Sequence, residues 1–446
     1  MKIMQKKKKK LSTYQIVIIS FLVLIFTGTL LLMLPVAAKN GQGLSFVNAF
    51  FTAASSVCVT GLTVVDTGEY FTVFGQTVII FLVQCGALGL MSFATILMVA
   101  FGRDVNYTER LLMKDALNQG NLSGIIRLTI NLFKLTFIVE LIAGTLFAFK
   151  FYPEYGLKGI YYGYWHAISA FCNAGFDLFG KGKSLTDYVS DPFINLSFAF
   201  LILLGGIGFN VIWDVYKQRK FSKLTLHSKV VLSTNGILLL LGMLLFLFFE
   251  YGNMETLGSL SFENKLMASF FQSVSVRTAG FNTVSILDLN PQTALLLIVF
   301  MLIGASPSST GGGLKTTTFA VVIMAAWSVI RGKSDTVLFK RRISDETVNR
   351  SFTIVTIYIM VMVFSCFVIM ALEKFSFFHV VFEVAATFST TGISCEIISS
   401  MSDISKIFLV FIMFIGRVGP LTLALALMLR SDHGLVKYPE DNIMVG

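Results

Sequence analysis

Four short stretches of the sequence each place one glycine in the same setting. They read ASSVCVTGLTVVD (54–66), SAFCNAGFDLFG (169–180), SVSVRTAGFNTVSI (273–286) and AATFSTTGISCEI (385–397). A dehydrated monovalent cation needs several oxygens in place of its water, and backbone carbonyls in an extended line can supply them. Glycine adopts at low cost the backbone conformation that such a line requires. The sequence therefore predicts a binding site for a monovalent cation at four carbonyl-lined segments: Cys58, Val59, Thr60, Gly61; Cys172, Asn173, Ala174, Gly175; Arg277, Thr278, Ala279, Gly280; and Ser389, Thr390, Thr391, Gly392.

The composition indicates the class of protein that must position these segments. The chain has 446 residues, of which 55% are hydrophobic and 13% charged, about half the charged fraction of a soluble protein. Such a chain is expected to be an α-helical membrane protein. Eight apolar runs are long enough to cross a bilayer: 14–34, 73–101, 128–150, 192–216, 229–249, 292–331, 352–372 and 406–430.

A shorter apolar stretch precedes each glycine stretch and fits a re-entrant half-helix. These stretches are 46–57, 161–172, 266–276 and 379–389. We therefore expect an all-α integral membrane fold of four pseudo-symmetric helix–pore-loop–helix repeats around a central ion pore, with eight transmembrane helices and four re-entrant half-helices. The negative C-terminal ends of the half-helices would favour a cation there. The expected repeats are 14–101, 128–216, 229–331 and 352–430.

The distribution of charge predicts the orientation. With the basic N-terminus (1–13) and the C-terminal tail (431–446) in the cytoplasm, cytoplasmic segments hold 23 of the 35 lysines and arginines, as the positive-inside rule requires. The run Lys6–Lys10 could suggest nucleic acid, but anionic lipid beside a membrane helix explains it better. We predict a multi-pass protein of the cell membrane that binds no nucleic acid. Acids expected outside, where they would concentrate cations, are Asp66, Glu69, Asp177, Asp187, Asp191, Asp288, Glu396 and Asp403.

The run 292–331 contains a polar interruption, residues 305–315 (ASPSSTGGGLK). Pro307 and Gly311–Gly313 would break a helix there. A cytoplasmic linker is the alternative, but the 13 apolar residues before it cannot cross a bilayer. We expect an intramembrane gate loop below the glycine segments. The predicted gate residues are Gly304, Ala305, Ser306, Pro307, Ser308, Ser309, Thr310, Gly311, Gly312, Gly313, Lys315 and Arg417.

Other charges within apolar runs need partners or a function. Arg277 is expected to brace its segment from behind, and Lys134 to extend towards the membrane surface. Glu140 is expected to pair with Lys134 or a neighbouring helix. His166 and Glu383 are interpreted as half-helix anchors. The glycine pairs Gly86/Gly89, Gly205/Gly208 and Gly416/Gly419 are interpreted as sites of close helix packing.

These motifs, with VVDTGEYFTVFGQTVI, HAISAFCNAGF, RTAGFN, GASPSSTGGGLKTTT and FIGRVGPLT, make the chain resemble the membrane subunit of bacterial Ktr-type potassium transporters, within the Trk/Ktr/HKT superfamily. The resemblance implies potassium uptake through a filter built on the four glycines. It also implies that the 305–315 loop gates the pore and that Arg417 faces the pore, obstructs cations and contacts that loop; a structural salt bridge is the alternative for Arg417. The implied partners are a second copy of the chain and a cytosolic ring of RCK-type nucleotide-binding regulators, for which loops 217–229 and 331–350 and the C-terminal tail are the expected docking surface. Sodium dependence or symport is a property of the family, and no organic cofactor is expected on this chain.

Two alternatives of other classes remain at this stage. An intramembrane hydrolase would need paired acids, a His/Ser constellation or a metal cluster, and the four histidines (His166, His227, His379 and His433) form no such pattern. A carrier for sodium or ammonium is the second alternative. Glycine at all four positions favours potassium over these ions.

Overall fold

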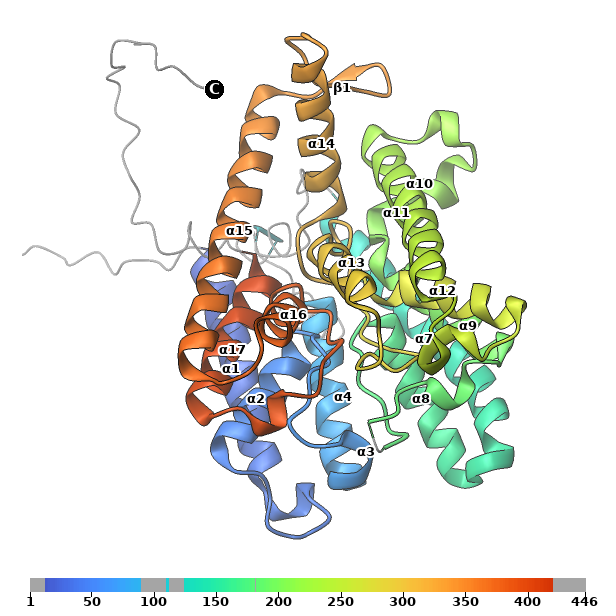
Figure 1. Cartoon of the computed structure of the whole chain (residues 1–446), viewed down its shortest axis with the longest axis vertical. Coiled ribbons are helices and arrows are strands. Elements are labelled where there is room, and N and C mark those ends of the chain that lie inside the picture. Colours follow the sequence, from blue (N-terminus) through green and yellow to red (C-terminus); the bar gives the residue numbers. More distant parts are fainter. Residues whose placement is uncertain (1–12, 90–109, 112–123, 181, 420–446) are drawn as a thin grey trace, which may run out of the picture.

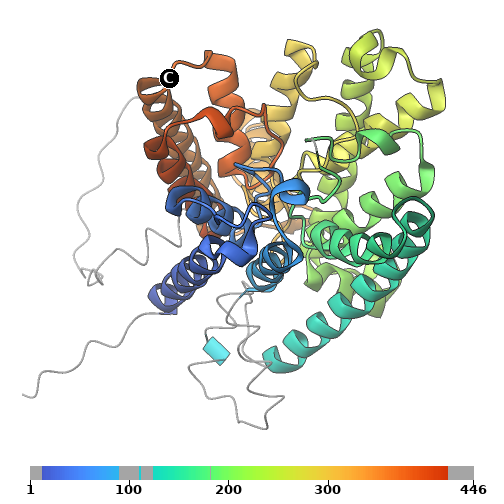
Figure 2. The same cartoon turned by 90° about the horizontal axis from the view of Figure 1, so that it is seen from below.

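The computed structural model describes residues 13–89, 110–111, 124–180 and 182–419, and these residues are mostly helical, with one short hairpin of two strands. The predicted N-terminal segment 1–13 lies, apart from its last residue, outside the described residues, and the C-terminal tail lies wholly outside them. Figure 1 shows α14 and β1 at one end of the molecule and α3 at the other. In the perpendicular view, helices from all quarters of the chain surround a shared centre (Figure 2).

Each repeat contains a long outer helix, a short buried helix and an inner helix. The outer helices are α1 (Thr13–Met33), α7 (Ile125–Tyr155), α11 (Leu226–Glu250) and α15 (Asp345–Leu372). The short helices are α2 (Phe46–Val57), α8 (Leu157–Phe171), α12 (Phe262–Ser275) and α16 (Phe377–Phe388). The inner helices are α4 (Val73–Leu88), α9 (Pro192–Gly206), α13 (Pro291–Leu302) and α17 (Asp403–Val418). The order predicted from the sequence is confirmed in all four repeats.

Smaller elements connect these helices. They are η1 (Pro35–Ala37), α3 (Thr67–Tyr70), η2 (Thr186–Tyr188), α10 (Phe209–Gln218), η3 (Phe221–Lys223), the π-helix η4 (Met254–Gly258), α14 (Thr316–Ile330), the hairpin β1 (Val337–Leu338) and β2 (Arg341–Arg342), and η5 (Ile398–Ser400). Several helix starts have side-chain caps, which satisfy amide groups that a helix leaves free. The side chain of Asp191, for example, accepts from the Ile194 amide at the start of α9.

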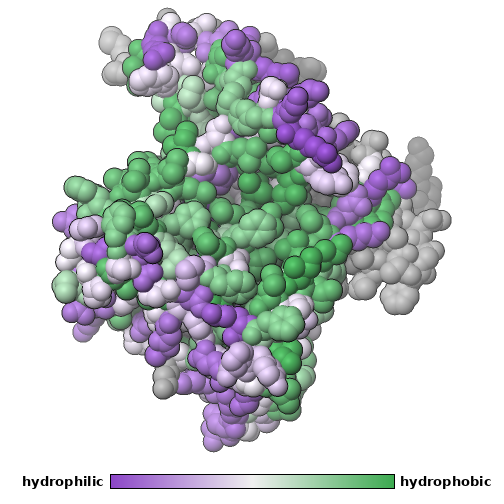
Figure 3. All heavy atoms as spheres, turned by 90° about the vertical axis from the view of Figure 1, so that its right-hand side faces the viewer, coloured by the Kyte–Doolittle hydropathy of each residue, from purple (hydrophilic) through white to green (hydrophobic). Residues whose placement is uncertain are grey.

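The burial pattern separates core from lipid. The short helices are buried towards their C-terminal ends, as in α2, where Phe51 to Val57 are all inside. The outer helices instead expose large apolar side chains, such as Phe149 on α7 and Phe367 on α15. Figure 3 shows apolar residues across the middle of one face, with hydrophilic residues gathered towards its ends. This band is the surface that a bilayer covers.

The four outer helices are long and apolar enough to cross a membrane, but the inner helices are not continuous spans. They have only 12 to 16 residues, which at 1.5 Å per residue is at most about 24 Å. The predicted span over 192–216 is not one straight helix, because α9 and α10 meet at an angle of 98°. The predicted runs 73–101 and 406–430 form helix only to Leu88 and Val418, and their remaining residues lie, apart from the capping glycines Gly89 and Gly419, outside the described part.

The glycine pairs explain the breaks. The second glycine of each pair lies at a helix end with φ between 80° and 95° and ψ between 123° and 133°: Gly89 and Gly419 follow α4 and α17, and Gly208 precedes α10. An L-residue rarely adopts these angles. The first glycine lies where a β-carbon would collide with the carbonyl of the last residue of the short helix; for Gly205 this is Phe171. Close packing at the pairs is therefore confirmed, and the helix breaks are a feature that the sequence analysis missed.

Candidate ion pathway

The four glycines form a closed ring around one axis. A β-carbon at Gly61 would meet the carbonyl oxygen of Ala174, and one at Gly175 would meet that of Ala279 at 2.8 Å. The contacts continue from Gly280 to the Thr391 oxygen at 2.5 Å, and from Gly392 back to the Thr60 oxygen. Each glycine thus faces the carbonyl that precedes the next glycine. Residues 58–61, 172–175, 277–280 and 389–392, called the glycine segments below, meet at one point.

Each glycine segment contains a second residue with a left-handed backbone. The residues two positions before the glycines have φ of 58° at Val59, 58° at Asn173, 72° at Thr278 and 54° at Thr390. Such a conformation costs on the order of 1–3 kcal/mol for a residue with a side chain, and strain of this kind concentrates at functional sites. Valine and threonine are unfavourable in this conformation, so Val59, Thr278 and Thr390 carry no local signal for it.

The hydrogen bonds of the glycine segments use their amides and leave their carbonyls free. The amides of Thr60, Ala174 and Thr391 donate to carbonyls five residues back, at 2.8 to 2.9 Å, and Ala279 donates to Ser275 at 3.0 Å. No residue in the described part of the chain donates to a carbonyl of these segments. The segments are also buried, so these free oxygens suit a desolvated cation.

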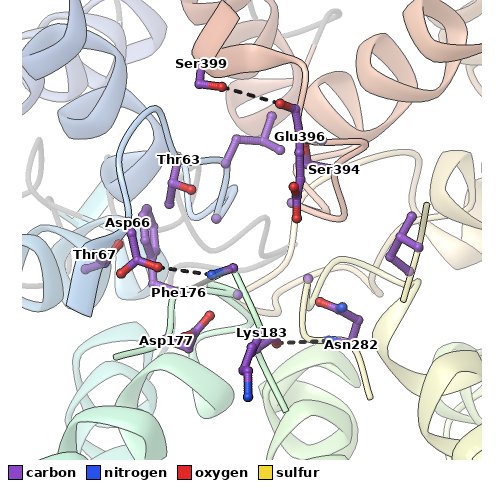
Figure 4. Close-up of a pocket in the computed structure, with 18 of the residues that line it drawn as sticks. Thr63, Asp66, Thr67, Phe176, Asp177, Lys183, Asn282, Ser394, Glu396 and Ser399 are labelled. Atoms are coloured by element: carbon purple, nitrogen blue, oxygen red, sulfur yellow. Dashed lines mark hydrogen bonds between the residues drawn. The ribbon is translucent and has the colours of Figure 1, made fainter. Parts of the chain in front are cut away.

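A cavity of about 480 Å³ opens on one side of the glycine ring, and all four glycines lie along its wall. Three of the eight acids expected outside also line this vestibule: Asp66, Asp177 and Glu396. Figure 4 shows these carboxylates approaching the space from three different chain segments, with Lys183 as a basic neighbour. Other predicted acids have structural roles instead; Asp191, for example, pairs with Lys150 at 2.6 Å.

Burial, and then the negative charge of Asp66, raise the pKa of Asp177 to about 7. The carboxylate of Asp177 also accepts a hydrogen bond from the Phe179 amide at 3.1 Å. Asp177 therefore changes charge near neutral pH at the mouth of the ring.

On the other side of the ring lies a loop of residues 303–315, called the Gly/Ser loop below. Gly311 lies beside the Thr278 hydroxyl and Gly312 beside the Thr390 hydroxyl, so closely that a β-carbon on either glycine would collide with that oxygen. The hydroxyls of Thr278 and Thr390 are buried and have no hydrogen-bond partner among the described residues. The loop thus lies against the glycine ring from the side opposite the cavity.

The Gly/Ser loop is bound to the break between α9 and α10. The amides of Ser306 and Thr310 donate to the carbonyls of Gly206 and Gly205 at 3.0 and 3.1 Å, and the Phe209 amide donates to the Ser308 carbonyl at 2.9 Å. Within the loop, Lys315 Nζ donates to the Gly311 carbonyl at 2.8 Å. The loop is therefore held by hydrogen bonds to one neighbouring repeat and by a short internal brace.

Arg417 connects the Gly/Ser loop to a second repeat. Its guanidinium donates to the Thr310 carbonyl in the loop, to the Gly86 carbonyl at 2.6 Å and to the Ala87 carbonyl at 3.2 Å. The last two are carbonyls at the C-terminus of α4, where a cation is favoured. Among the described residues Arg417 has no carboxylate partner, so the structure does not support the alternative of a salt bridge.

The structure also supplies partners for the other buried polar side chains. Glu140 pairs with a neighbouring helix, since Gln84 of α4 donates to its carboxylate at 3.0 and 3.2 Å. His166 Nε2 accepts from the Leu178 amide at 3.1 Å, and Glu383 accepts from the Cys395 amide at 3.1 Å. Both interpretations as anchors are confirmed, because each side chain ties its short helix to the non-helical residues that follow a glycine.

Sequence reasoning missed two buried amides, Gln84 and Asn235, which lie in membrane helices. Asn235 accepts from Arg277 at 2.5 Å and donates to Ser306 at 3.1 Å. An amide side chain inside an apolar run is the signal that could have identified both residues.

Comparison with known proteins places this geometry in a family. Residues 4–435 match the family model TrkH, described as cation transport protein. This chain belongs to the TrkH family. The family consists of transport proteins, so the chain is not an enzyme, and the alternative of an intramembrane hydrolase is excluded.

Individual members of the TrkH family agree with the resemblance expected from the sequence. The chain is 39% identical to the Ktr system potassium uptake protein B of Bacillus subtilis, over 97% of this chain and 96% of that protein. It is 35% identical to the potassium/sodium uptake protein NtpJ of Enterococcus hirae, over the full length of both. The crystal structure of the potassium transporter TrkH from Vibrio parahaemolyticus matches the fold with a TM-score of 0.72 and 20% identity, covering 95% of this chain and 86% of that one.

Proposed function

We propose that this chain is the ion-translocating membrane subunit of a bacterial potassium uptake system, with K+ passing through the glycine ring. The observation that carries the proposal is the closed ring, in which each glycine faces a carbonyl of the next repeat and the carbonyls of the segments have no donor among the described residues. The Bacillus and Enterococcus relatives are named for potassium uptake. The glycine segments are the proposed filter.

The proposed walls of the pore are the four repeats 14–101, 128–216, 229–331 and 352–430. Both termini lie in the cytoplasm in this proposal, so the vestibule faces outward and the Gly/Ser loop inward. Cations would then enter past Asp66, Asp177 and Glu396, whose negative charge raises their local concentration.

The proposed gate is the Gly/Ser loop with Arg417. The loop lies directly under the ring, and its contact with Arg417 places a positive charge where the cation would leave. A positive group near the path opposes cation passage. Opening requires the loop to leave its hydrogen bonds to the α9–α10 break, which are weak enough individually to be exchanged.

The proposed partners are a second copy of the chain and a cytosolic ring of nucleotide-binding regulators. Loops 217–229 and 331–350 are expected to bind the regulatory proteins. These loops lie close together, since the centres of the exposed Phe221 and Phe339 side chains are 6.1 Å apart. Arg341 and Arg342 of β2 add positive charge beside them. Sodium is the proposed activating or coupled ion, as the name of the Enterococcus relative suggests.

Uptake in a potassium-transport-deficient strain that carries the cognate regulatory subunit tests the function. We expect growth and K+ accumulation at low external K+, with Na+ in large excess failing to compete. Omitting Na+ in a parallel culture tests its activating role. Transport of Na+ or ammonium in preference to K+ would replace the proposal by the alternative carrier.

External pH provides a second prediction. Because the pKa of Asp177 is about 7, acidification neutralises its carboxylate. The vestibule then attracts cations only through Asp66 and Glu396, and therefore more weakly. At sub-saturating K+, uptake should fall about twofold to threefold between pH 8 and pH 6. Asp177→Asn should remove most of this dependence when initial rates are measured with Rb+ as tracer. An unchanged profile in the variant would show that Asp177 does not control entry.

A further inference from the structure

A buried polar chain connects the third glycine segment to the Gly/Ser loop. Arg277 donates to the Asn235 side-chain oxygen at 2.5 Å, and Asn235 donates to the Ser306 hydroxyl at 3.1 Å. The Ser306 and Thr316 hydroxyls are 2.9 Å apart. All four residues are at least nine-tenths buried. This series of hydrogen bonds joins three parts of the protein: the third glycine segment, α11, and the Gly/Ser loop with the start of α14.

Arg277 depends on Asn235 for its position. In the described part of the chain it has no carboxylate partner, and its Nε has no hydrogen-bond partner. The Asn235 oxygen is the one acceptor that the described residues offer to its side chain. A cation in a membrane interior is held strongly by such a contact, since water is excluded.

Asn235 is fixed in one orientation by its three partners. Its amide nitrogen donates to the Val231 carbonyl at 2.7 Å as well as to Ser306, and its oxygen faces Arg277. Movement of Ser306 with the loop would remove one of these partners. The Asn235 side chain could then turn, and Arg277 would lose its fixed acceptor.

The repeats differ in the residue at the Arg277 position. The corresponding residues three positions before the other glycines are Cys58, Cys172 and Ser389. All three are small, whereas the repeat that contains the Gly/Ser loop has a long cation directed at α11. The long side chain of Arg277 thus occurs in the repeat that contains the Gly/Ser loop, where one residue, Asn235, connects the two.

We propose that Asn235 is a positioning residue that couples the Gly/Ser loop to the third glycine segment, so that loop position alters ion preference at the ring. This inference rests on the proposed function, in which the ring selects K+ and the loop gates it. Ser306 forms no hydrogen bond to a residue of the glycine segments in the described structure. Its effect on ion preference would therefore pass either through Asn235 or through the contacts of the loop glycines Gly311 and Gly312 with the glycine segments, and a double-mutant cycle separates the two routes.

A double-mutant cycle on the full chain, expressed with its regulatory subunit, tests the coupling. The readouts are the K+ concentration for half-maximal uptake and the Na+ concentration that halves uptake. Ser306→Ala and Asn235→Leu should each reduce the preference for K+ over Na+ about fivefold, and the double variant should be no worse than Asn235→Leu alone. The matched control is Ser273→Ala, which removes a partly buried hydrogen bond from α12 to the Leu239 carbonyl of α11 at 2.8 Å and should leave the preference unchanged.

Asn235→Ala keeps the cycle usable if the leucine variant does not reach the membrane. Alanine offers neither the acceptor for Arg277 nor the donor to Ser306, so the preference for K+ should fall as in the leucine variant and should no longer respond to Ser306→Ala. Additive effects, or a Ser306→Ala variant with unchanged preference, would overturn the coupling. A wild-type chain that does not prefer K+ would instead overturn the proposed function itself.

Discussion

Replacing Gly392 by alanine should abolish K+ uptake, with at least about a hundredfold loss of rate, since each 1.36 kcal/mol changes a rate tenfold. Two effects add together. Gly392 has φ of 84°, which costs about 1–2 kcal/mol for an L-residue. The new β-carbon would also collide with the Thr60 carbonyl, so the ring must distort at the oxygens that are proposed to bind the ion.

Alanine substitutions at the four glycines should reduce transport to different extents, because the surroundings of the glycines differ. At Gly175 the nearest carbonyl oxygen is 2.8 Å from the added carbon, the longest such distance in the ring, and φ is the smallest at 72°. Gly175→Ala should therefore retain the most transport and lose selectivity before it loses rate. Uptake of K+, Rb+ and Na+ by the four variants, measured at matched membrane content, gives the ranking.

Gly236→Ala is the matched control. Gly236 lies inside α11 with no atom within 4 Å of an added carbon, and alanine is a better helix former than glycine by about 1 kcal/mol. Normal transport in this variant and failure in Gly392→Ala would separate the ring from a general effect on folding. Normal K+ selectivity in Gly392→Ala would show that ions do not pass the ring.

The sequence was sufficient to predict the fourfold repeat and the positions of the four glycines, because both depend on local composition. Apolar length identified the helices, and the position after each short helix identified Gly61 and its equivalents. The break after α9 was missed because 192–216 is predominantly apolar, and hydropathy does not register the backbone conformation of Gly208. The left-handed conformation of Val59 was also beyond prediction, since tertiary packing imposes it against local preference.

The partners of the buried charges required three-dimensional information. Arg417 and Thr310 are far apart in sequence and meet only when two repeats pack around the axis. Likewise, Arg277 could be expected to brace its segment, but its acceptor lies 42 residues earlier on α11. Sequence spacing predicts partners one helical turn away, and these contacts have no such spacing.

Arg417→Ala should raise K+ flux by about fivefold to tenfold, the second large effect expected. The substitution removes a cation near the path, whose interaction with K+ at 4 Å would be about 4 kcal/mol at an effective dielectric constant of 20; screening and relaxation reduce this value. It also releases the Thr310 carbonyl, and with it the link between the Gly/Ser loop and α4. Deletion of Gly311–Gly313 should have the same direction of effect, because it removes the part of the loop that lies against Thr278 and Thr390.

Selectivity distinguishes a gate from a filter in this experiment. Both variants should carry more K+ while keeping the preference over Na+, because the glycine ring is unchanged. Arg417→Lys should give an intermediate flux, since lysine keeps the charge but cannot bridge three carbonyls as the planar guanidinium does. Lys134→Ala, which removes an exposed cation from another helix, should match the wild type. Flux that is unchanged or lower in both Arg417→Ala and the deletion would mean that the Gly/Ser loop supports the ring from below without closing it.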